Sequence, residues 1–496
     1  MTVYVCVHGH AYQPPREDPA TGEVPLQPSA APFHDWNERI TDECYRPFGE
    51  ADVLNESGEI AEEINLWGEV SFDLGPTLGV WIDRHAPAVA AAIAAGDAAG
   101  GGAIAHPWVH AILPLTPFWD RSTIIRWGID EYVARFGRRP SGMWLPETAV
   151  DSASLEALVD AGIDWVVLAP HQIRRVDGGA HGAGAGGAGA ALVDPGHRPL
   201  SMTLPSGRSI TVVPYDGPLS HGVAFNGMLN DGVGLAEAFI AVASDLEPGS
   251  LVVAATDLET FGHHHGLGEM ALAKAVEVWR ASEDVELITI ERFLERFPPT
   301  ERGVLVERTS WSCAHGIERW RSNCGCRFSE VEGQDQSWRR PLRDWLDAVA
   351  EACRRAMIEF AGADLRNPWA ARNDYGRVIG ALPADLDTRR VEFLAAHLAE
   401  GGDSERALAW MEAERLRLEA WSSCGWFFDS VDRIETIQII AEAEAALERY
   451  RKLTGLPLDL PVPTELVPPA ALVSPADLAP GADLVPPADL VPPAGA

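Results

Sequence analysis

The sequence predicts an α/β protein built on a parallel sheet that closes, or nearly closes, into a barrel. Short apolar runs alternate with helical segments about seven times within roughly the first 300 residues. Polar and titratable residues gather where these runs end, as they do at the carboxyl edge of parallel strands. Later in the chain the pattern changes to long segments with helical apolar spacing, which predict a helical domain packed onto the barrel.

Seven runs are expected to form the strands, because each is short, apolar and bounded by turn residues. In chain order they span residues 3–7, 70–74, 101–106, 142–147, 165–168, 209–213 and 251–255. Helical composition and spacing separate them. The expected helices span residues 88–99, 122–136, 154–161, 235–246 and 270–281, and in the helical domain 344–360, 386–400, 404–420 and 434–454. This strand–helix order is typical of βαβ units.

Composition divides the chain into three parts. Residues 1–305 are expected to form the catalytic barrel, and residues 306–460 the helical domain. Residues 461–496 form a Pro-rich tail that repeats every six residues, and its prolines predict extended disorder. The Gly- and Ala-rich segment 178–190 has nothing to bury and is expected to be a flexible loop.

The charge balance excludes several classes of function. Lys and Arg number 39 against 73 Asp and Glu, giving a net charge of −34, which argues against nucleic-acid and anionic-membrane partners. The N-terminus lacks a basic, apolar leader, and no window approaches about 18 uninterrupted apolar residues, so neither a signal peptide nor a spanning helix is expected. Seven cysteines, an odd number, fit a reducing cytosol. We therefore expect a cytoplasmic protein with a neutral or cationic substrate.

The most informative stretch is 251–265, where an apolar run leads into Asp257, Glu259 and the histidines 263–265. Glu147 stands at the end of an earlier run. Two carboxylates on separate strands supply what glycosidic cleavage needs, because one attacks or stabilises the sugar centre and the other protonates the leaving oxygen. Other strand ends add His8, His10, His106 and Asp216. If the barrel closes, all these side chains converge on one mouth.

These residues resemble the motifs of glycoside hydrolase family 57. The third and fourth motifs are the most specific, and the first has extra residues between His and Gln. In motif order, the matching segments are His8-Gly-His10-Ala-Tyr-Gln13-Pro14, Gly102-Ala-Ile-Ala-His106-Pro107, Trp144-Leu-Pro-Glu147, Asp257-Leu-Glu259-Thr-Phe261-Gly262-His263 and Ser422-Ser-Cys424-Gly-Trp426-Phe427. The resemblance spans about residues 1 to 455. Members of one subgroup continue beyond this point, so a missing C-terminal region is compatible with the resemblance.

The resemblance implies an incomplete (β/α)7 barrel followed by an α-helical domain, and retaining chemistry on α-glucans. It implies Glu147 as the nucleophile and Asp257 as the general acid/base. Asp257 is accordingly expected to have a raised pKa and Glu147 is not. Trp426 is expected at the pocket rim, where it would stack on a sugar. The residues expected to bind substrate are His8, His10, Gln13, His106, Trp144, Asp216, Glu259, His263 and Trp426.

Three functions remain open. The leading one is a glycosidase or glucanotransferase that acts on an oligo- or polysaccharide and needs no metal or other cofactor. The second is a metal-dependent carbohydrate deacetylase, in which imidazoles and a carboxylate hold a divalent ion. The ligands considered for it are His8, His10, His106, Asp257 and His263. The third is a glucan-binding protein without catalysis. The oligomeric state is not predicted.

A separate cluster holds three thiols and one imidazole, which together make a complete zinc ligand set. Its members are Cys313, His315, Cys324 and Cys326. Their spacing is not a standard zinc motif, and the alternative is a set of buried or loop thiols. Metal binding therefore stays open for this segment.

Overall fold

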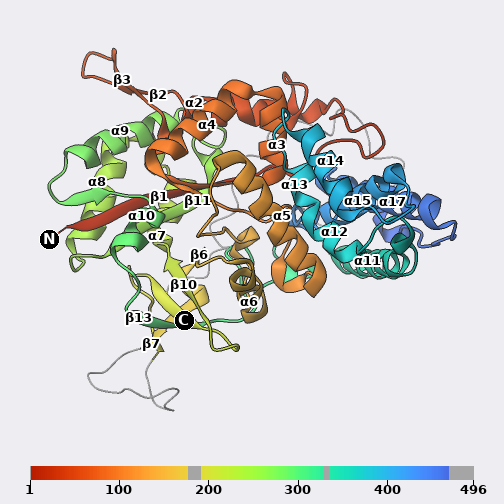
Figure 1. The fold of residues 1–496 in the computed structure, drawn as a ribbon. Coiled ribbons are helices and arrows are strands. Elements are labelled where there is room, and N and C mark those ends of the chain that lie inside the picture. Colours follow the sequence, from red (N-terminus) through yellow and green to blue (C-terminus); the bar gives the residue numbers. More distant parts are fainter. Residues whose placement is uncertain (1, 177–191, 329–334, 468–496) are drawn as a thin grey trace.

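The computed structural model describes residues 2–176, 192–328 and 335–467. The predicted Gly- and Ala-rich loop 178–190 and most of the predicted tail lie outside the described residues. The described part is a mixed α/β protein with parallel strands and many helices (Figure 1). Within it, no helix has the length and apolar character needed to cross a membrane.

The first sheet is parallel and centres on β1 (Val3–Ala11). This strand pairs on one side with β11 (Leu251–Asp257). On the other side it pairs with β12 (Val285–Leu287) along its first residues and with β4 (Ser71–Leu74) along its last. Strand β4 then pairs with β5 (Ala103–Ile104). All four predicted runs of this sheet are therefore strands, and β12 is an addition that the sequence did not indicate.

The second sheet combines predicted parallel strands with an extension of mixed direction. Two predicted strands, β6 (Trp165–Leu168) and β10 (Ser209–Pro214), pair in parallel. The extension was not predicted, because its strands are short and partly polar. Its strands follow β10 in the order β9 (Leu200–Thr203), β13 (Glu301–Leu305), β7 (Ile173–Val176) and β8 (Leu192–Val193). In this extension β9 and β13 pair in parallel, and the other pairs are antiparallel.

Parallel contacts join the two sheets at both edges. On one edge, the predicted run 142–147 forms isolated parallel bridges, from Met143 to Ala105 and from Gly142 to Trp165. On the other edge, the amide of Asp216 donates to the carbonyl of Val253 at 2.7 Å. The strand ends of the two sheets are thereby brought to one region.

Side chains along β1 alternate between two buried clusters, as the pleat of a strand requires. Tyr4 and Cys6 belong to a cluster with Val253 and Trp144, which lies between the two sheets. Val5 and the other odd-numbered residues belong to the larger core that includes the helices. The interior cluster forms the floor beneath the strand ends.

The helices between the strands match the predicted segments within a few residues at most ends. Helix α6 shows why: the Asp151 side chain caps its first turn, and Gly162 ends it at φ 86°. A short antiparallel hairpin of β2 (Ala51–Leu54) and β3 (Ile60–Ile64) was not predicted. The helices are α1 (Trp36–Ile40), α2 (Arg46–Phe48), α3 (Pro76–His85), α4 (Pro87–Gly100), α5 (Phe118–Phe136), α6 (Ser152–Ala161), α7 (Gly217–Phe225), α8 (Gly232–Ser244), α9 (Gly268–Ala281) and α10 (Ile290–Arg296).

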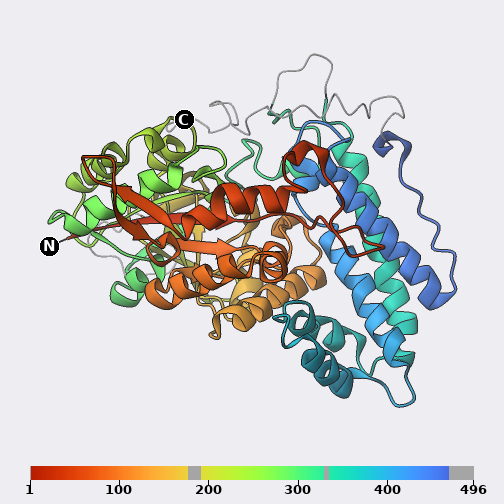
Figure 2. The same cartoon turned by 90° about the horizontal axis from the view of Figure 1, so that it is seen from above.

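The later helices gather on one side of the strands (Figure 1), and the longest of them run alongside one another (Figure 2). Four of them are the predicted segments. Leu466, just after the helices, is buried at 1% exposure, so packing continues to that residue. The helices are α11 (Arg339–Phe360), α12 (Pro368–Asp374), α13 (Gly376–Ile379), α14 (Leu386–His397), α15 (Ser404–Glu419), α16 (Cys424–Phe427) and α17 (Ile434–Thr454).

Candidate active site

Three neighbouring strands place three titratable residues side by side at their carboxyl ends. In the parallel register, Asp257 of β11 lies beside His10 of β1, and His10 lies beside Asp73 of β4. Each is an even number of residues from an interior side chain of its own strand, such as Cys6 in β1 or Val253 in β11. The alternation of side chains therefore turns His10 and Asp257 toward the space between the sheets.

Glu147 enters the same region from a strained turn. Its φ is 58°, and the next residue, Thr148, has φ 47°. Two successive non-glycine residues in the left-handed region cost about 1–3 kcal/mol each, and such strain concentrates at functional sites. The turn is held by the amide of Trp311, which donates to the Glu147 carbonyl at 3.0 Å. The surrounding structure thus fixes the direction of a carboxylate that an ordinary turn would leave in solvent.

The loop after β13 also holds the Glu147 carboxylate itself. The indole Nε1 of Trp311 donates to Oε2 at 3.1 Å, and the Ser312 hydroxyl donates to the same oxygen. No described donor bonds to Oε1, so one oxygen is fixed while the other remains available. The side chain is 8% exposed.

Burial, together with the negative charges of Glu259 and Glu147, raises the pKa of Asp257 to about 7, while the charge of His10 opposes them. No hydrogen bond from the described residues holds its ionised form. The predicted raised pKa of this carboxyl group is therefore confirmed. A group with this pKa holds its proton up to neutral pH and can give it to a leaving oxygen.

The expectation that Glu147 has an unshifted pKa was wrong. Burial raises the pKa of Glu147, against hydrogen bonds from Ser312 and Trp311 and the charge of Arg319, which lower it. The reason is that the strained turn withdraws the carboxylate from water. The same turn brings the donors that favour its ionised form.

A hydrogen-bonded chain runs from Asp73 through two imidazoles. His10 Nδ1 lies 2.8 Å from Asp73 Oδ2, its Nε2 lies 3.1 Å from His110 Nε2, and His110 Nδ1 lies 2.6 Å from Ser423 Oγ. Burial lowers the pKa of His10, but the charge and hydrogen bond of Asp73 outweigh it and raise the pKa to about 9. His10 is therefore cationic at neutral pH and donates from both nitrogens.

Other aromatic rings stack around His10 and leave polar atoms without partners. His8 stacks on Trp144 with ring centroids 4.8 Å apart, and its Nε2 bonds to Asp73 at 3.1 Å. Burial lowers the pKa of His106 to about 3. Its Nδ1 donates to the Pro107 carbonyl at 2.6 Å, so Nε2 is a hydrogen-bond acceptor. No described donor bonds to Nε2. The indole Nε1 of Trp144 also has no hydrogen-bond partner among the described residues.

Glu259 and Gln13 occupy the wall behind Asp257. The Tyr45 hydroxyl donates to Glu259 Oε1, and Gln13 Nε2 donates to the same oxygen at 3.3 Å. Arg16 in turn donates to Gln13 Oε1 at 2.8 Å. These contacts bring Gln13, Glu259, His8, His10, His106 and Trp144 to one region with Glu147 and Asp257, as predicted from the strand ends.

Two predicted binding residues are engaged elsewhere. Asp216 caps α7 through the amide of Leu219 at 2.8 Å, and its other oxygen lies 2.9 Å from His197. His263 Nδ1 faces Glu43 at 2.5 Å. Neither side chain contacts the two carboxylates among the described interactions, because Asp216 caps α7 and His263 pairs with Glu43, 220 positions away in the chain.

The predicted position of Trp426 at the pocket rim was wrong. Its side chain is 1% exposed, and its Nε1 donates to the carbonyl of Arg339 at 3.2 Å. The Arg343 guanidinium covers the ring at 5.0 Å from its centroid. The helical packing around α11 and α16 therefore makes this aromatic residue part of the core.

The sequence analysis did not select several residues that touch the site. Asp73 lies within a predicted strand, where a carboxylate counted only as part of the run. His110 lies four residues after His106, a signal that a search for paired histidines would have found. Trp311 and Ser312 reach Glu147 from a distant loop, and no local pattern indicates this contact.

Two groups of side chains have the composition of metal sites. One consists of Cys313, His315, Cys324 and Cys326, and the other of His10, His106 and His110. In each group, the potential ligand atoms lie within 4.8 Å of one another. The histidine group borders the carboxylates, whereas the cysteine group lies in the loop that supports Glu147.

Parallel strands with two buried carboxylates at their ends and stacked His and Trp side chains nearby supply the groups that glycosidic cleavage needs. Residues 79–306 match the family described as glycosyl hydrolase family 57, and residues 335–466 match a domain of unknown function, DUF3536. The resemblance seen in the motifs is thus confirmed for residues 79–306, the segment that contains Glu147 and Asp257.

Several solved enzyme structures have a fold similar to that of this chain. An exo-type maltose-forming amylase from Pyrococcus sp. ST04 has 17% sequence identity and a TM-score of 0.69, with 91% of this chain and 80% of that chain covered. A GH57-type branching enzyme from Pyrococcus horikoshii has 16% identity and a TM-score of 0.55, with 90% and 88% covered. A 4-alpha-glucanotransferase from Thermococcus litoralis has 16% and 0.55, with 91% and 60% covered. No curated protein sequence matches the chain.

Proposed function

We propose that the protein cleaves or transfers α-glucans by a retaining mechanism with two carboxylates, on an incomplete (β/α)7 barrel. The observation that carries this proposal is the pair of buried carboxylates at strand ends, of which Asp257 has a pKa near 7 in the field of Glu147. The parallel bridges between the two sheets support the barrel. The names of the structurally similar enzymes support an α-glucan as the substrate.

Glu147 acts as the nucleophile. Ser312 and Trp311 hold its Oε2, which leaves Oε1 to form a bond with the anomeric carbon. Arg319 and His10 favour the ionised form of Glu147 by their charge. The glycosyl–enzyme bond forms as the bond to the leaving oxygen breaks.

Asp257 acts first as general acid and then as general base. Its protonated form gives the proton to the leaving oxygen. In the second half, its carboxylate takes a proton from water in hydrolysis, or from a sugar hydroxyl in transfer. Either acceptor breaks the bond to Glu147 and restores both carboxyl groups.

The aromatic wall provides sugar recognition. A sugar hydroxyl would donate to His106 Nε2 and accept from Trp144 Nε1, the two unfilled polar atoms described above. The cationic His10, held by Asp73, supplies a fixed positive charge beside Asp257 and Glu259. We infer that these side chains bind the sugar on which cleavage takes place.

A metal-dependent deacetylase is the second candidate, because His10, His106 and His110 have ligand atoms within 4.8 Å of one another. A divalent ion there would have to displace the proton of His10, whose pKa is raised to about 9. That requirement makes the two-carboxylate mechanism the better supported function.

The test is product analysis on maltooligosaccharides of defined length and on longer α-glucans. We expect new reducing ends or longer products, first products that keep the α configuration, and a loss of about 10⁴-fold or more in Glu147→Gln. Azide should restore turnover in Glu147→Ala with the opposite configuration. Wild-type protein that turns over none of these glucans, or that releases acetate from acetylated sugars only with added divalent metal, would reject the proposal.

A further inference from the structure

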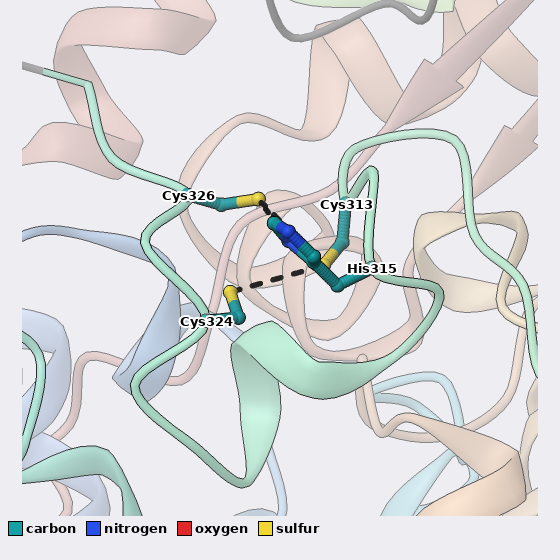
Figure 3. Close-up of side chains that lie close together, drawn as sticks. All are labelled: Cys313, His315, Cys324 and Cys326. Atoms are coloured by element: carbon teal, nitrogen blue, oxygen red, sulfur yellow. Dashed lines mark hydrogen bonds between the residues drawn. The ribbon is translucent and has the colours of Figure 1, made fainter.

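One loop folds three thiols and an imidazole against each other beside the Glu147 support (Figure 3). Cys313 Sγ lies 4.0 Å from Cys324 Sγ and 3.8 Å from Cys326 Sγ. Cys326 Sγ lies 3.4 Å from His315 Nδ1. The four side chains point toward one common centre, although the chain between them makes a full excursion through Glu318–Trp320.

These separations are those of a tetrahedral zinc site. With Zn–S near 2.3 Å and Zn–N near 2.0–2.1 Å, a tetrahedron places two sulfurs about 3.8 Å apart and a sulfur and a nitrogen about 3.6 Å apart. The measured S···S and S···N separations lie within about 0.2 Å of these values. A Cys₃His set is a complete structural zinc ligand set with no open position.

A disulfide does not account for this arrangement. A disulfide needs S–S near 2.05 Å and consumes two thiols, whereas Cys313 is nearly equidistant from two partners. Bridging either pair would leave the third thiol and His315 without a role. Four ligands around one centre use all the groups present.

The backbone is shaped to bring the ligands together. The amide of Gly316 donates to the carbonyl of Cys313 at 3.0 Å, which closes a turn around His315. Gly316 has φ 81°, and a Cβ there would meet the Arg308 carbonyl at 2.3 Å. Gly325, with φ 87°, lies between the other two cysteines and turns both of them inward.

The buried positive charges around the cluster also favour a negatively charged centre. Arg319, which lies between the two halves of the ligand set in the sequence, is 0% exposed, and none of its guanidinium nitrogens has a hydrogen-bond partner among the described residues. It rests on the ring of Phe427 at 4.5 Å. Arg339, also buried, donates to the Cys326 carbonyl at 3.1 Å. Zn²⁺ with three thiolates and a neutral imidazole carries one net negative charge, which would add to that of the Glu147 carboxylate in offsetting the buried charge of Arg319.

We propose that Cys313, His315, Cys324 and Cys326 bind one structural Zn²⁺. The ion fixes the loop whose neighbouring residues, Trp311 and Ser312, hold the Glu147 carboxylate. The metal assignment is independent of the reaction, whereas the positioning of Glu147 rests on the proposed function.

The test measures metal in the full-length protein purified with reductant, by elemental analysis. We expect about one zinc per chain, and less than about 0.1 in Cys324→Ser and in Cys326→Ser. The matched control is Cys353→Ser, a buried cysteine of α11 outside the cluster, which should keep one zinc. The wild-type protein stripped with a chelator should bind one equivalent of Co²⁺ and show the absorption of a tetrahedral cobalt thiolate.

The cobalt measurement keeps the proposal falsifiable if a serine variant fails to fold. Iron in place of zinc, fewer than seven titratable thiols in the denatured protein, or no cobalt thiolate absorption would overturn the proposal. Zinc that persists in both serine variants and disappears in His106→Ala would place the ion among the histidines instead. All these readouts need no substrate, so their failure is distinct from failure of the proposed reaction.

Discussion

Two groups of buried carboxylates in this protein have pKa values shifted in opposite directions. At the strand ends, burial and the charges of Glu259 and Glu147 raise the pKa of Asp257 to about 7. Between α5 and α15, Asp120 is just as buried, yet the guanidiniums of Arg417 and Arg372 outweigh burial and lower its pKa to about 2.

The difference lies in the counter-ions, and burial is common to both. Asp120 receives two charge-assisted hydrogen bonds from Arg417, at 2.7 and 2.8 Å, and Glu414 shares the same arginines. Asp257 has only the more distant charge of His10 to favour its ionised form. A carboxylate paired in this way stabilises an interface, and one left unpaired can exchange a proton near neutral pH.

The largest expected effect is on the unpaired group. Asp257→Asn should lower kcat by about 10²–10⁴-fold and remove the basic limb of the pH–rate profile near pH 7. The sign follows from the role: the acid works while protonated, so the wild-type rate falls as pH rises through the pKa. The measurement is kcat against pH on an α-glucan.

The matched control is Asp120→Asn, the same chemical change in the paired group. It should lower the melting temperature and leave the basic limb in place, because Asp120 is held by arginines between two helices. A basic limb that survives in Asp257→Asn would show that another group supplies the proton.

The second effect concerns stability. Arg417→Met removes the principal partner of Asp120 and Glu414 while it retains much of the volume. Uncompensated buried charge should lower the free energy of unfolding by about 3–5 kcal/mol. Denaturant unfolding measures this loss, and the pH–rate profile of the folded protein should not change.

An exposed arginine provides the comparison for that variant. Arg355 pairs with Glu351 on the surface of α11, and Arg355→Met should change the free energy of unfolding by less than about 1 kcal/mol. If the two variants lose equal stability, the ion pairs between α5 and α15 are not what holds that interface.

The smallest effect tests the source of the raised pKa. Glu259→Gln removes a negative neighbour of Asp257, so the pKa of Asp257 should fall and the basic limb should move to lower pH by up to about one unit. Glutamine can still accept from Tyr45 and Gln13. Glu63→Gln, an exposed change of equal charge on β3, should leave the limb unmoved. A limb that stays in place in Glu259→Gln would assign the shift to burial and the other carboxylates, such as Glu147.

The local sequence pattern was sufficient to predict the main parallel strands, the long helices and the two carboxylates. The apolar runs ending in Glu147 and Asp257 predicted strands with titratable ends, because strand and helix periods are written in neighbouring residues. The helices around α6 and α15 followed from spacing and caps. The strands β7, β8, β9 and β13 were missed, since their short, partly polar runs have no such period.

What the sequence by itself determined is which residues carry charge at strand ends and which segments are strands or helices. Only the tertiary structure decided which of these groups meet. Asp216 and His263 follow strands as Asp257 does, yet a helix cap holds Asp216 and an ion pair with the distant Glu43 holds His263 elsewhere. Trp426 belongs to one of the sequence motifs, yet its side chain is buried in the hydrophobic core. Trp311 and Ser312 reach Glu147 across more than 160 positions, because contacts between distant segments depend on packing, which no local period encodes.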